Sequence, residues 1–402
     1  MNKATIRELA GRVKGKRVFL RSDLNTPQDK EGNITDDTRI RASLDTIRYL
    51  ADKGARIILS AHLGRPKSKA DTQFTLKPIY ERLCELLPQT KIFFAPDSIG
   101  PEVEKMVSNL GDGQILLLEN IRFYKEESEN DMAHAKKLAS LADYYVNDAF
   151  GAAHRAHAST EGIAKFLPAV CGFLMEKEIK ILGEAINNPR RPLTVIMGGK
   201  KVSDKMGVIN GLLQVANNLL IGGGMSYTFA KAHGGEVGNS IVDESSIDYC
   251  KQVVKDAKAR GVNMITAIDS VVADDFSNDA HTMVVPTNKI PAGWEGLDIG
   301  EKTINEFKKV IAKSGTVIWN GPLGVSEMPT FANGTTQIAN AILDSGAVAI
   351  IGGGDAAAAV ARMGIADRFT HISTGGGASL EFLEGKKLPG VEALLGKEVK
   401  IS

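Results

Sequence analysis

The stretch from Arg17 to Ser60, RVFLRSDLNTPQDKEGNITDDTRIRASLDTIRYLADKGARIILS, holds the pattern that decides the fold. Continuous apolar runs at 17–22 and 56–60 are typical of strands that are covered on both faces. Between them, residues 39–52 repeat apolar side chains at helical spacing. A strand, a helix and a second strand in this order predict neighbouring parallel strands in a doubly wound sheet.

The same alternation continues along the rest of the chain. Further β-rich runs lie at 91–95, 114–118, 143–147, 193–197, 218–221, 263–268, 316–319 and 347–351. Helical patterns alternate with them at 131–142, 204–216, 245–260 and 332–343. About ten strands in a chain of 402 residues predict an α/β protein with two doubly wound, parallel-sheet (Rossmann-like) domains joined by a helical hinge.

The boundary between the two domains is expected near residues 176–191. Ile179, Leu182 and Ile186 lie on one side of an amphipathic helix, which Pro189 ends. An ordinary surface helix would show the same pattern, but the composition also changes here. We therefore predict a first domain over 1–175, a connector helix over 176–191 and a second domain over 192–387.

Arginine and glycine divide unevenly between the two halves of the chain. Residues 1–191 hold 14 arginines and 12 glycines, whereas the remainder holds 3 arginines and 29 glycines. Arginine binds oxyanions with a planar side-chain fork, while glycine lets backbone N–H groups approach a phosphate at a helix N-terminus. We expect the two halves to bind anionic groups by different means.

Charge and cysteine usage exclude several classes of protein. Lys plus Arg number 49 and Asp plus Glu 48, a balance that argues against nucleic-acid and membrane-surface partners. The three cysteines are far apart and odd in number, which is typical of a reducing compartment. With no signal-peptide pattern or long apolar run, the sequence predicts a cytoplasmic protein without a membrane partner.

In the first half, polar and basic residues follow the predicted strands, where open α/β sheets bind their ligands. These residues are Arg21, Asp23, Asn25, His62, Arg65, Arg122, His154, Arg155 and His157, with Arg39 at the start of the first helix. Several cationic side chains brought to one edge predict a pocket for a small, phosphorylated anion. A metal site at the two last histidines lacks a third ligand nearby, and a GxSxG nucleophile motif is absent.

In the second half, strands run into glycine turns that precede helices. The turns lie at 198–199, 222–224, 352–354 and 375–377, and each can present N–H groups to a phosphate. Gly352-x-Gly354-x-x-Ala357 also fits a dinucleotide fingerprint, but Asp355 would repel a pyrophosphate unless a cation such as Mg²⁺ lay between them. Lys201 and Lys205, expected on one helical face, favour a magnesium nucleotide over NAD. An NAD-dependent oxidoreductase and a binding scaffold remain the alternatives.

The motifs together closely resemble those of the phosphoglycerate kinase family over nearly the whole chain. The matching segments are RSDLN, TRIRASL, HLGRP, ENIRF, VNDAFGAAHRAHAS, GGKKVSDK, IGGGM, GLDIG, WNGPLGVSE, IGGGD and HISTGGGASLEFLEGK. The resemblance implies a two-domain glycolytic enzyme that transfers a phosphoryl group reversibly from 1,3-bisphosphoglycerate to ADP. It is a phosphotransferase with a carboxyl group as acceptor.

The resemblance also implies the site residues. The substrate-binding residues would be Asp23, Asn25, Arg39, His62, Arg65, Arg122 and Arg155. The residues that bind ADP or ATP would be Lys201, Lys205, Gly296, Glu327, Gly353, Gly354, Asp355 and Ala356. Arg39, Lys201 and Gly376 would be catalytic, and Asp355 would lie nearest the Mg²⁺.

Five further expectations follow from the resemblance. The attacking carboxylate is already anionic, so no general base is required. The two domains would close to bring their ligands together. The C-terminal tail, 388–402, would pack back on the first domain, and the protein would be a monomer. Lys200, Ser326 and Ala356 depart from the family pattern, and we expect them to affect nucleotide affinity more than activity.

Overall fold

The computed structural model describes residues 2–399, which form two compact units. Unit 1 runs from the N-terminal part of the chain to Lys180 and resumes at Lys387. Unit 2 is Ile181–Lys386. Both units carry a six-stranded parallel sheet with helices packed on it, so the predicted α/β fold class is confirmed.

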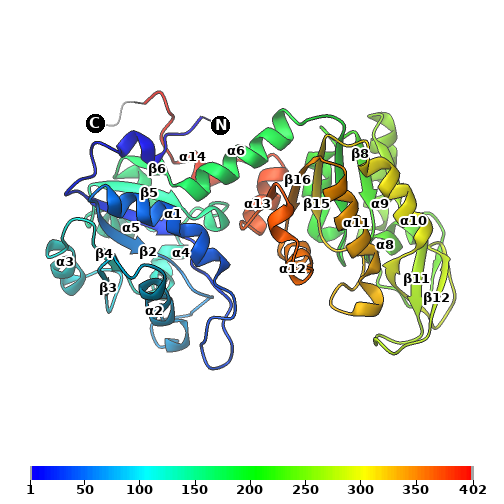
Figure 1. Cartoon of the computed structure of the whole chain (residues 1–402), viewed down its shortest axis with the longest axis horizontal. Coiled ribbons are helices and arrows are strands. Elements are labelled where there is room, and N and C mark those ends of the chain that lie inside the picture. The colour runs from blue at the N-terminus through cyan, green and yellow to red at the C-terminus, as the bar shows by residue number, and fades with distance from the viewer. Residues whose placement is uncertain (1, 400–402) are drawn as a thin grey trace. The chain divides into compact units, whose positions relative to one another are not determined.

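The sheet of unit 1 contains all five strands predicted in the first half of the chain. Its strands are β1 (Arg17–Ser22), β2 (Arg56–Ser60), β3 (Ile92–Phe94), β4 (Ile115–Leu117), β5 (Tyr144–Asp148) and β6 (Ala169–Cys171), in the order β3-β4-β2-β1-β5-β6 (Figure 1). The edge strand β6, which has three residues, was not predicted.

The helices of unit 1 cover this sheet with their apolar faces. They are α1 (Thr38–Asp52), α2 (Lys77–Leu86), α3 (Pro101–Ser108), α4 (Lys125–Ser128) and α5 (Met132–Ala139). Short 3₁₀ turns accompany them at η1 (Ile6–Leu9), η2 (Thr72–Phe74), η3 (Ile121–Phe123), η4 (Phe150–Ala152) and η5 (Gly162–Lys165). In α1, Ile40, Leu44 and Ile47 recur at helical spacing and are buried in the core, which explains why this segment is helical.

The chain passes from unit 1 to unit 2 within one helix, α6 (Phe173–Asn187). This helix begins three residues before the predicted connector and ends before Pro189, as the proline requires. The chain returns to unit 1 near its end, where α14 (Pro389–Glu392) lies. There the amide of Gly390 donates to the carbonyl of Ala153 (2.9 Å).

Unit 2 contains the five strands predicted in the second half. The main sheet consists of β7 (Leu193–Met197), β8 (Asn218–Ile221), β10 (Asn263–Thr266), β15 (Thr316–Asn320), β16 (Val348–Gly352) and β17 (His371–Ile372), in the order β10-β8-β7-β15-β16-β17. Trp319 in β15 is fully buried and packs into the core beside Phe369.

Two small sheets in unit 2 were missed by the sequence pattern. One is antiparallel and joins β11 (Asp269–Ala273), β12 (Thr282–Pro286) and β14 (Glu295–Ile299), and the other joins β9 (Glu236–Val237) to β13 (Lys289–Ile290). Exposed residues alternate along β12, so this strand lacks the continuous apolar run that marks the main strands.

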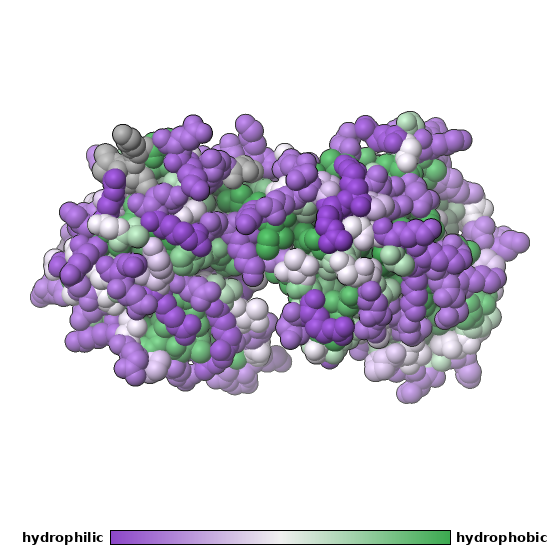
Figure 2. Space-filling view, turned by 45° about the horizontal axis from the view of Figure 1, so that its top comes forward, coloured by the Kyte–Doolittle hydropathy of each residue, from purple (hydrophilic) through white to green (hydrophobic). Residues whose placement is uncertain are grey.

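Seven helices of the described part of unit 2 flank its sheets. They are α7 (Met206–Leu212), α8 (Met225–Ala232), α9 (Ile247–Ala259), α10 (Glu301–Ile311), α11 (Asn333–Asp344), α12 (Gly354–Arg362) and α13 (Gly377–Leu383). The 3₁₀ turns are η6 (Ser203–Lys205), η7 (Glu244–Ser246), η8 (Pro329–Phe331) and η9 (Ala366–Arg368). Hydrophilic residues cover most of the face shown in Figure 2. Across residues 2–399, each helix is too short or too polar to cross a bilayer.

Candidate functional site

In unit 1, the predicted site residues gather at one edge of the sheet. Because β1, β2, β4 and β5 are parallel neighbours, the loops that follow them all leave from their carboxyl ends. The chain reverses its direction of progress across the sheet between β1 and β5. Ligands of open α/β sheets bind at such a reversal, so this edge is the candidate anion site.

Arg39 and Asp23 form an ion pair at this edge. Nη1 of Arg39, in the first turn of α1, lies 3.1 and 3.2 Å from the two carboxylate oxygens of Asp23. The side chain of Asp23 is only 6% exposed, whereas that of Arg39 is 34% exposed. The carboxylate therefore orients the guanidinium, whose remaining N–H groups are available for an anion.

The loops after β1, β2 and β4 hold one another in place. Oδ1 of Asn25 accepts a hydrogen bond from the amide of Gly64 (2.8 Å), and Nη1 of Arg122 donates to the carbonyl of Gly64 (3.0 Å). Asn120 donates from Nδ2 to the carbonyl of Leu63 (2.9 Å). These bonds fix the segment that carries His62 and Arg65 without using their side chains.

The cationic residues of the edge differ in burial. Arg65 and Arg155 are exposed, and Nε of Arg155 lies 3.2 Å from Nε2 of His154. Arg122 is half-buried, and burial, with the neighbouring Arg21 guanidinium, lowers the pKa of Arg122 to about 10. The guanidinium still remains charged near neutral pH, so the edge carries several positive charges close together.

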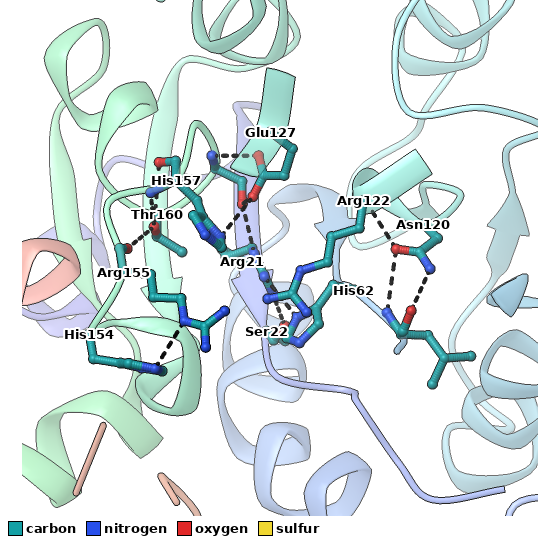
Figure 3. A network of polar contacts seen from close by, with 12 residues as sticks. Arg21, Ser22, His62, Asn120, Arg122, Glu127, His154, Arg155, His157 and Thr160 are labelled. Atoms are coloured by element: carbon teal, nitrogen blue, oxygen red, sulfur yellow. Dashed lines mark hydrogen bonds and ion pairs between the residues drawn. The ribbon is translucent and has the colours of Figure 1, made fainter. Parts of the chain in front are cut away.

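A buried hydrogen-bonded chain lies behind these cations (Figure 3). Arg21 is fully buried and lies between His62 and the segment around Glu127. Nη2 of Arg21 lies 3.0 Å from Nδ1 of His62, and Nε of Arg21 donates to the hydroxyl of Ser159 (2.9 Å). Burial, with Arg21, Arg122 and Arg39 beside it, lowers the pKa of His62 well below its usual range.

In unit 2, the glycine turns and a lysine converge on the carboxyl edge of the main sheet. The sheet reverses between β7 and β15, where the amide of Gly199 donates to the carbonyl of Pro322 (3.0 Å). Nζ of Lys205 donates to Oδ1 of Asn320, whose Nδ2 donates to the carbonyl of Gly352 (2.6 Å). Burial lowers the pKa of Lys205, and the nearby Asp355 carboxylate acts in the opposite direction.

Each of the four glycine turns contains a residue whose backbone favours glycine, and two of these residues directly precede a helix in the candidate nucleotide site. Gly353 has φ +91° and immediately precedes α12, while Gly376 has φ +52° and immediately precedes α13. A Cβ on Gly353 would lie 2.8 Å from Nδ2 of Asn320. The turn before α12 therefore leaves Gly354 and Asp355 exposed at the N-terminus of a nine-residue helix, a favourable place for phosphate oxygens.

The structure corrects one expectation about the lysines. Lys201 and Lys205 do not share a helical face, because Lys201 lies in the loop after β7 and Lys205 ends the 3₁₀ turn η6. The four-residue spacing suggested a helix, but α7 begins only at Met206. Lys201 is exposed, whereas Lys205 is half-buried and donates to Asn320, so the two lysines have different surroundings.

The remaining predicted nucleotide residues have different surroundings. Glu327 is exposed in the loop after β15. Gly296 is buried in β14, where its amide donates to the hydroxyl of Ser240 (2.9 Å) and a Cβ would collide with the ring of Tyr227. Ala356 is fully buried in the core of unit 2. Gly296 and Ala356 thus have packing roles whether or not a nucleotide is bound.

Three positioning groups were missed by the sequence reading. Glu127 and Ser159 support Arg21, and Asn320 connects Lys205 to the glycine turn before α12. The sequence carries a weak signal for two of them, since Ser159 and Asn320 lie within the quoted motifs VNDAFGAAHRAHAS and WNGPLGVSE, but none for Glu127. Their partners are distant in sequence, so no local pattern could show what they contact.

The two sheet edges together define a class of protein: an α/β phosphotransferase that acts on small anionic molecules. Comparisons with known proteins narrow this class. The family model for phosphoglycerate kinase matches residues 6–386. A cytosolic phosphoglycerate kinase of Nicotiana tabacum is 55% identical over 386 residues, which cover 95% of this chain and 96% of that protein.

Solved structures give the same result. Phosphoglycerate kinase from Coxiella burnetii matches with a TM-score of 0.86 and 37% identity over 95% of this chain and 96% of that one. The enzyme from Pyrococcus horikoshii matches with a TM-score of 0.82 and 34% identity over the same shares.

The chain belongs to the phosphoglycerate kinase family. Its activity is the reversible transfer of a phosphoryl group between 1,3-bisphosphoglycerate and ADP, a step of glycolysis and gluconeogenesis. This assignment excludes the alternatives of an NAD-dependent oxidoreductase and a scaffold as the main role. The expected cytoplasmic location agrees with the tobacco relative, which is named as cytosolic.

Proposed function

We propose that unit 1 binds 3-phosphoglycerate or 1,3-bisphosphoglycerate through Arg39 and the other cations of its sheet edge, and that unit 2 binds the magnesium nucleotide at its glycine turns. The observation that supports this proposal is that the two units present different kinds of groups to an anion. Unit 1 presents arginine and histidine side chains, whereas unit 2 presents exposed backbone at the N-terminus of α12. Side-chain forks suit a small acid of fixed shape, and backbone amides suit a chain of phosphates.

Asp355 would hold the Mg²⁺ together with phosphate oxygens of the nucleotide. The carboxylate is exposed in the first turn of α12 and lies close enough to Lys205 to affect its pKa. Within residues 2–399 no group of three or more His, Cys, Asp or Glu side chains could hold a metal without help. A single carboxylate fits magnesium, which keeps several waters and takes its other ligands from the phosphates. When bound, the ion neutralises phosphate charge.

The residues of the chain would act by positioning and by charge. The attacking carboxylate of 3-phosphoglycerate needs no base, so catalysis depends on alignment and on stabilising the transferring phosphoryl group. Arg39 would bind the substrate carboxyl group and the transition-state oxygens. Lys201 would bind the transferring phosphoryl and Lys205 the nucleotide phosphates. Gly376, directly before α13, would stabilise the same charge through its backbone.

Calorimetric titration of two single-site variants tests this division. Arg122→Ala should weaken binding of 3-phosphoglycerate by about tenfold or more and leave Mg-ADP binding unchanged, because it removes a charge-assisted hydrogen-bond donor from unit 1. Asp355→Asn should do the reverse, and its ADP affinity should lose most of its dependence on Mg²⁺.

A matched control accompanies the unit 2 variant. Asp367→Asn makes the same change at an exposed position in η9 and should bind both ligands like the wild type. If Asp355→Asn weakened 3-phosphoglycerate binding instead, or if ADP kept its full response to Mg²⁺, the division would be wrong.

The monomeric state and the closure of the two halves stay predictions. A mass of 43.1 kDa by light scattering would match one chain. Small-angle scattering should show compaction only when both ligands are present, because in-line transfer requires the reacting atoms to come within about 3 Å. Scattering unchanged by the ligands would contradict closure.

A further inference from the structure

Glu127 is a buried acidic residue beside the cationic edge of unit 1, and it has no direct role in the phosphoryl transfer proposed above. Its side chain is fully buried at the middle of α4. Oε2 accepts the backbone amide of Ser159 (2.9 Å), and Oε1 accepts the hydroxyl of Ser159 (2.6 Å). A carboxylate in a desolvated place requires partners, and these bonds supply them.

The hydroxyl of Ser159 has one proton, and Glu127 determines where it points. Because that proton is donated to Oε1 of Glu127, the hydroxyl oxygen is free to accept from Arg21. Nε of Arg21 donates to it at 2.9 Å, and Nη1 of Arg21 donates to the carbonyl of Ser22 (2.5 Å). Two of the guanidinium's directions are thereby fixed, which aims Nη2 at His62.

The contact between Arg21 and His62 has only one possible polarity. A guanidinium can donate but cannot accept, so Nδ1 of His62, 3.0 Å from Nη2, must be unprotonated. A neutral imidazole carries one proton, which must then lie on Nε2. Protonation of Nδ1 would place two donors against each other.

We propose that Glu127 is a positioning residue that acts through Ser159 and Arg21 to hold His62 as the neutral tautomer with its proton on Nε2. The chain of hydrogen bonds joins four separate segments of unit 1, and Figure 3 shows Glu127, Arg21 and His62 among its members. His62 then offers a single, oriented N–H donor to the anion bound at the edge.

The electrostatics around the ring agree with this arrangement. The groups that face His62 are the guanidinium groups of Arg21, Arg122 and Arg39 and the imidazole of His157. With burial, they lower the pKa of His62 well below its usual range, and the pKa of His157 falls to about 4 for similar reasons. Both imidazoles are therefore neutral at the pH of the cytoplasm, and the charge of this edge comes from its arginines.

A neutral donor has a functional consequence, which rests on the proposed substrate site of unit 1. A ring that could protonate would make binding of the anion stronger as the pH falls through 6 to 7. A fixed Nε2–H donor contributes the same hydrogen bond across this range. The hydrogen-bonded chain from Glu127 thus makes the contribution of His62 independent of pH.

Nitrogen NMR of the free enzyme tests the tautomer without any substrate. With the histidines labelled at both ring nitrogens, His62 should show a protonated Nε2 and an unprotonated Nδ1 from pH 5.5 to 8.5. A protonated Nδ1, or a ring that titrates in this range, would overturn the proposal even if His62 binds the substrate.

Glu127→Gln tests the positioning role. The amide cannot accept from both groups of Ser159, so His62 should lose its single tautomer signature, and the KM for 3-phosphoglycerate should rise about tenfold with kcat changing less than threefold. Glu126→Gln makes the same substitution one residue earlier, at a partly exposed site, and should behave like the wild type. An unchanged His62 spectrum in Glu127→Gln would refute the role of Glu127.

Arg21→Gln provides a second variant should Glu127→Gln fail to fold. Loss of the guanidinium removes both the fixed donor and a repelling charge, so His62 should titrate and the KM should fall on acidification relative to the wild-type profile. A variant profile parallel to that of the wild type would contradict the proposal. His62→Gln separates the two ideas, because normal 3-phosphoglycerate binding by that variant would refute the substrate site and leave the tautomer measurement standing.

Discussion

Unit 1 and unit 2 use similar sheets for different chemistry. When the six strands of the main sheet of unit 2 are numbered in chain order, they lie side by side in the order 3-2-1-4-5-6, which is the order of a doubly wound dinucleotide fold. In unit 1 the fourth strand inserts between the third and the second. Both sheets reverse beside their first strand, and in both some of the candidate site residues lie in the loops at that reversal. The cations of unit 1, however, are side chains, whereas unit 2 relies on glycine backbone.

This difference determines how each site can fail. A side-chain site depends on charges that one substitution removes, and on the buried partners that orient them, such as Asp23 under Arg39. A backbone site has few side chains to remove, but it fails when a side chain is added where the chain needs glycine. The site of unit 1 should therefore be sensitive to substitutions that shorten a side chain, and the site of unit 2 to substitutions that replace a glycine with a larger residue.

Arg39→Ala should have the largest effect on turnover. The variant lacks the guanidinium that we propose stabilises the transferring phosphoryl group, so kcat should fall by about 10²–10³ while the free energy of unfolding changes little. Steady-state kinetics with saturating substrates measures the loss. Arg41→Ala, two residues along α1 at an exposed ion pair with Asp37, is the control and should keep its rate. A variant within a few-fold of the wild type would remove Arg39 from the catalytic assignment.

Gly353→Ala should have an intermediate effect and test the backbone site. A Cβ would approach Nδ2 of Asn320 at 2.8 Å, so the turn before α12 must shift, and we expect the KM for Mg-ADP to rise about tenfold. Gly364→Ala has a similar positive φ (+66°) but open space around its Cβ, so it should share the backbone strain without the change in KM. Equal KM values in the two variants would mean that strain alone explains the effect.

The smallest effects concern stability and pH, and they arise from one buried aspartate with a raised pKa in each unit, Asp148 in unit 1 and Asp298 in unit 2. Burial raises the pKa of Asp148 in unit 1 to about 6 and that of Asp298 in unit 2 to about 7. A raised pKa means that the folded state holds the proton more tightly. Stability is therefore fully present below the unfolded pKa near 3.8 and is lost as the pH rises through 6 and 7.

Asp298→Asn should remove part of this dependence of the free energy of unfolding on pH. The amide cannot ionise, so the free energy of unfolding should fall less between pH 5 and 8, by at most about 1.4 kcal/mol per pH unit for one proton. Denaturant unfolding at several pH values measures it. Asp148→Asn should reduce the pH dependence of the free energy of unfolding at a lower pH. Identical pH profiles for the two variants would contradict this difference between the units.

The sequence predicted the main sheets well because their strands are continuous apolar runs. Arg17–Ser22 and Leu193–Met197 are buried along nearly all their length, so their pattern depends on burial alone. The antiparallel strands of unit 2 were missed, because an edge strand such as β12 alternates exposed and half-buried residues over only five positions. Local pattern also placed Lys201 on a helix that begins later, where the glycine turn breaks the expected periodicity.

The sequence predicted the candidate site residues that lie at strand ends. It missed the buried residues that support them. His62 and Arg122 lie in the segments that follow β2 and β4, so strand position and charge were enough to select them. Glu127 lies 32 residues from Ser159, and Ser159 lies 138 residues from Arg21. Only the folded sheet brings these three together, and nothing local in the sequence pairs them.

The return of the chain to unit 1 affects how the protein is synthesised. Nδ2 of Asn147 in β5 donates to the carbonyl of Gly390 (3.1 Å), and the amide of Ala4 donates to the carbonyl of Leu395 (2.9 Å). A ribosome must therefore make all of unit 2, over about 10–40 s, before unit 1 receives its last partners. During that interval unit 1 lacks its C-terminal segment, and the synthesis of the last residues determines when its fold can be completed.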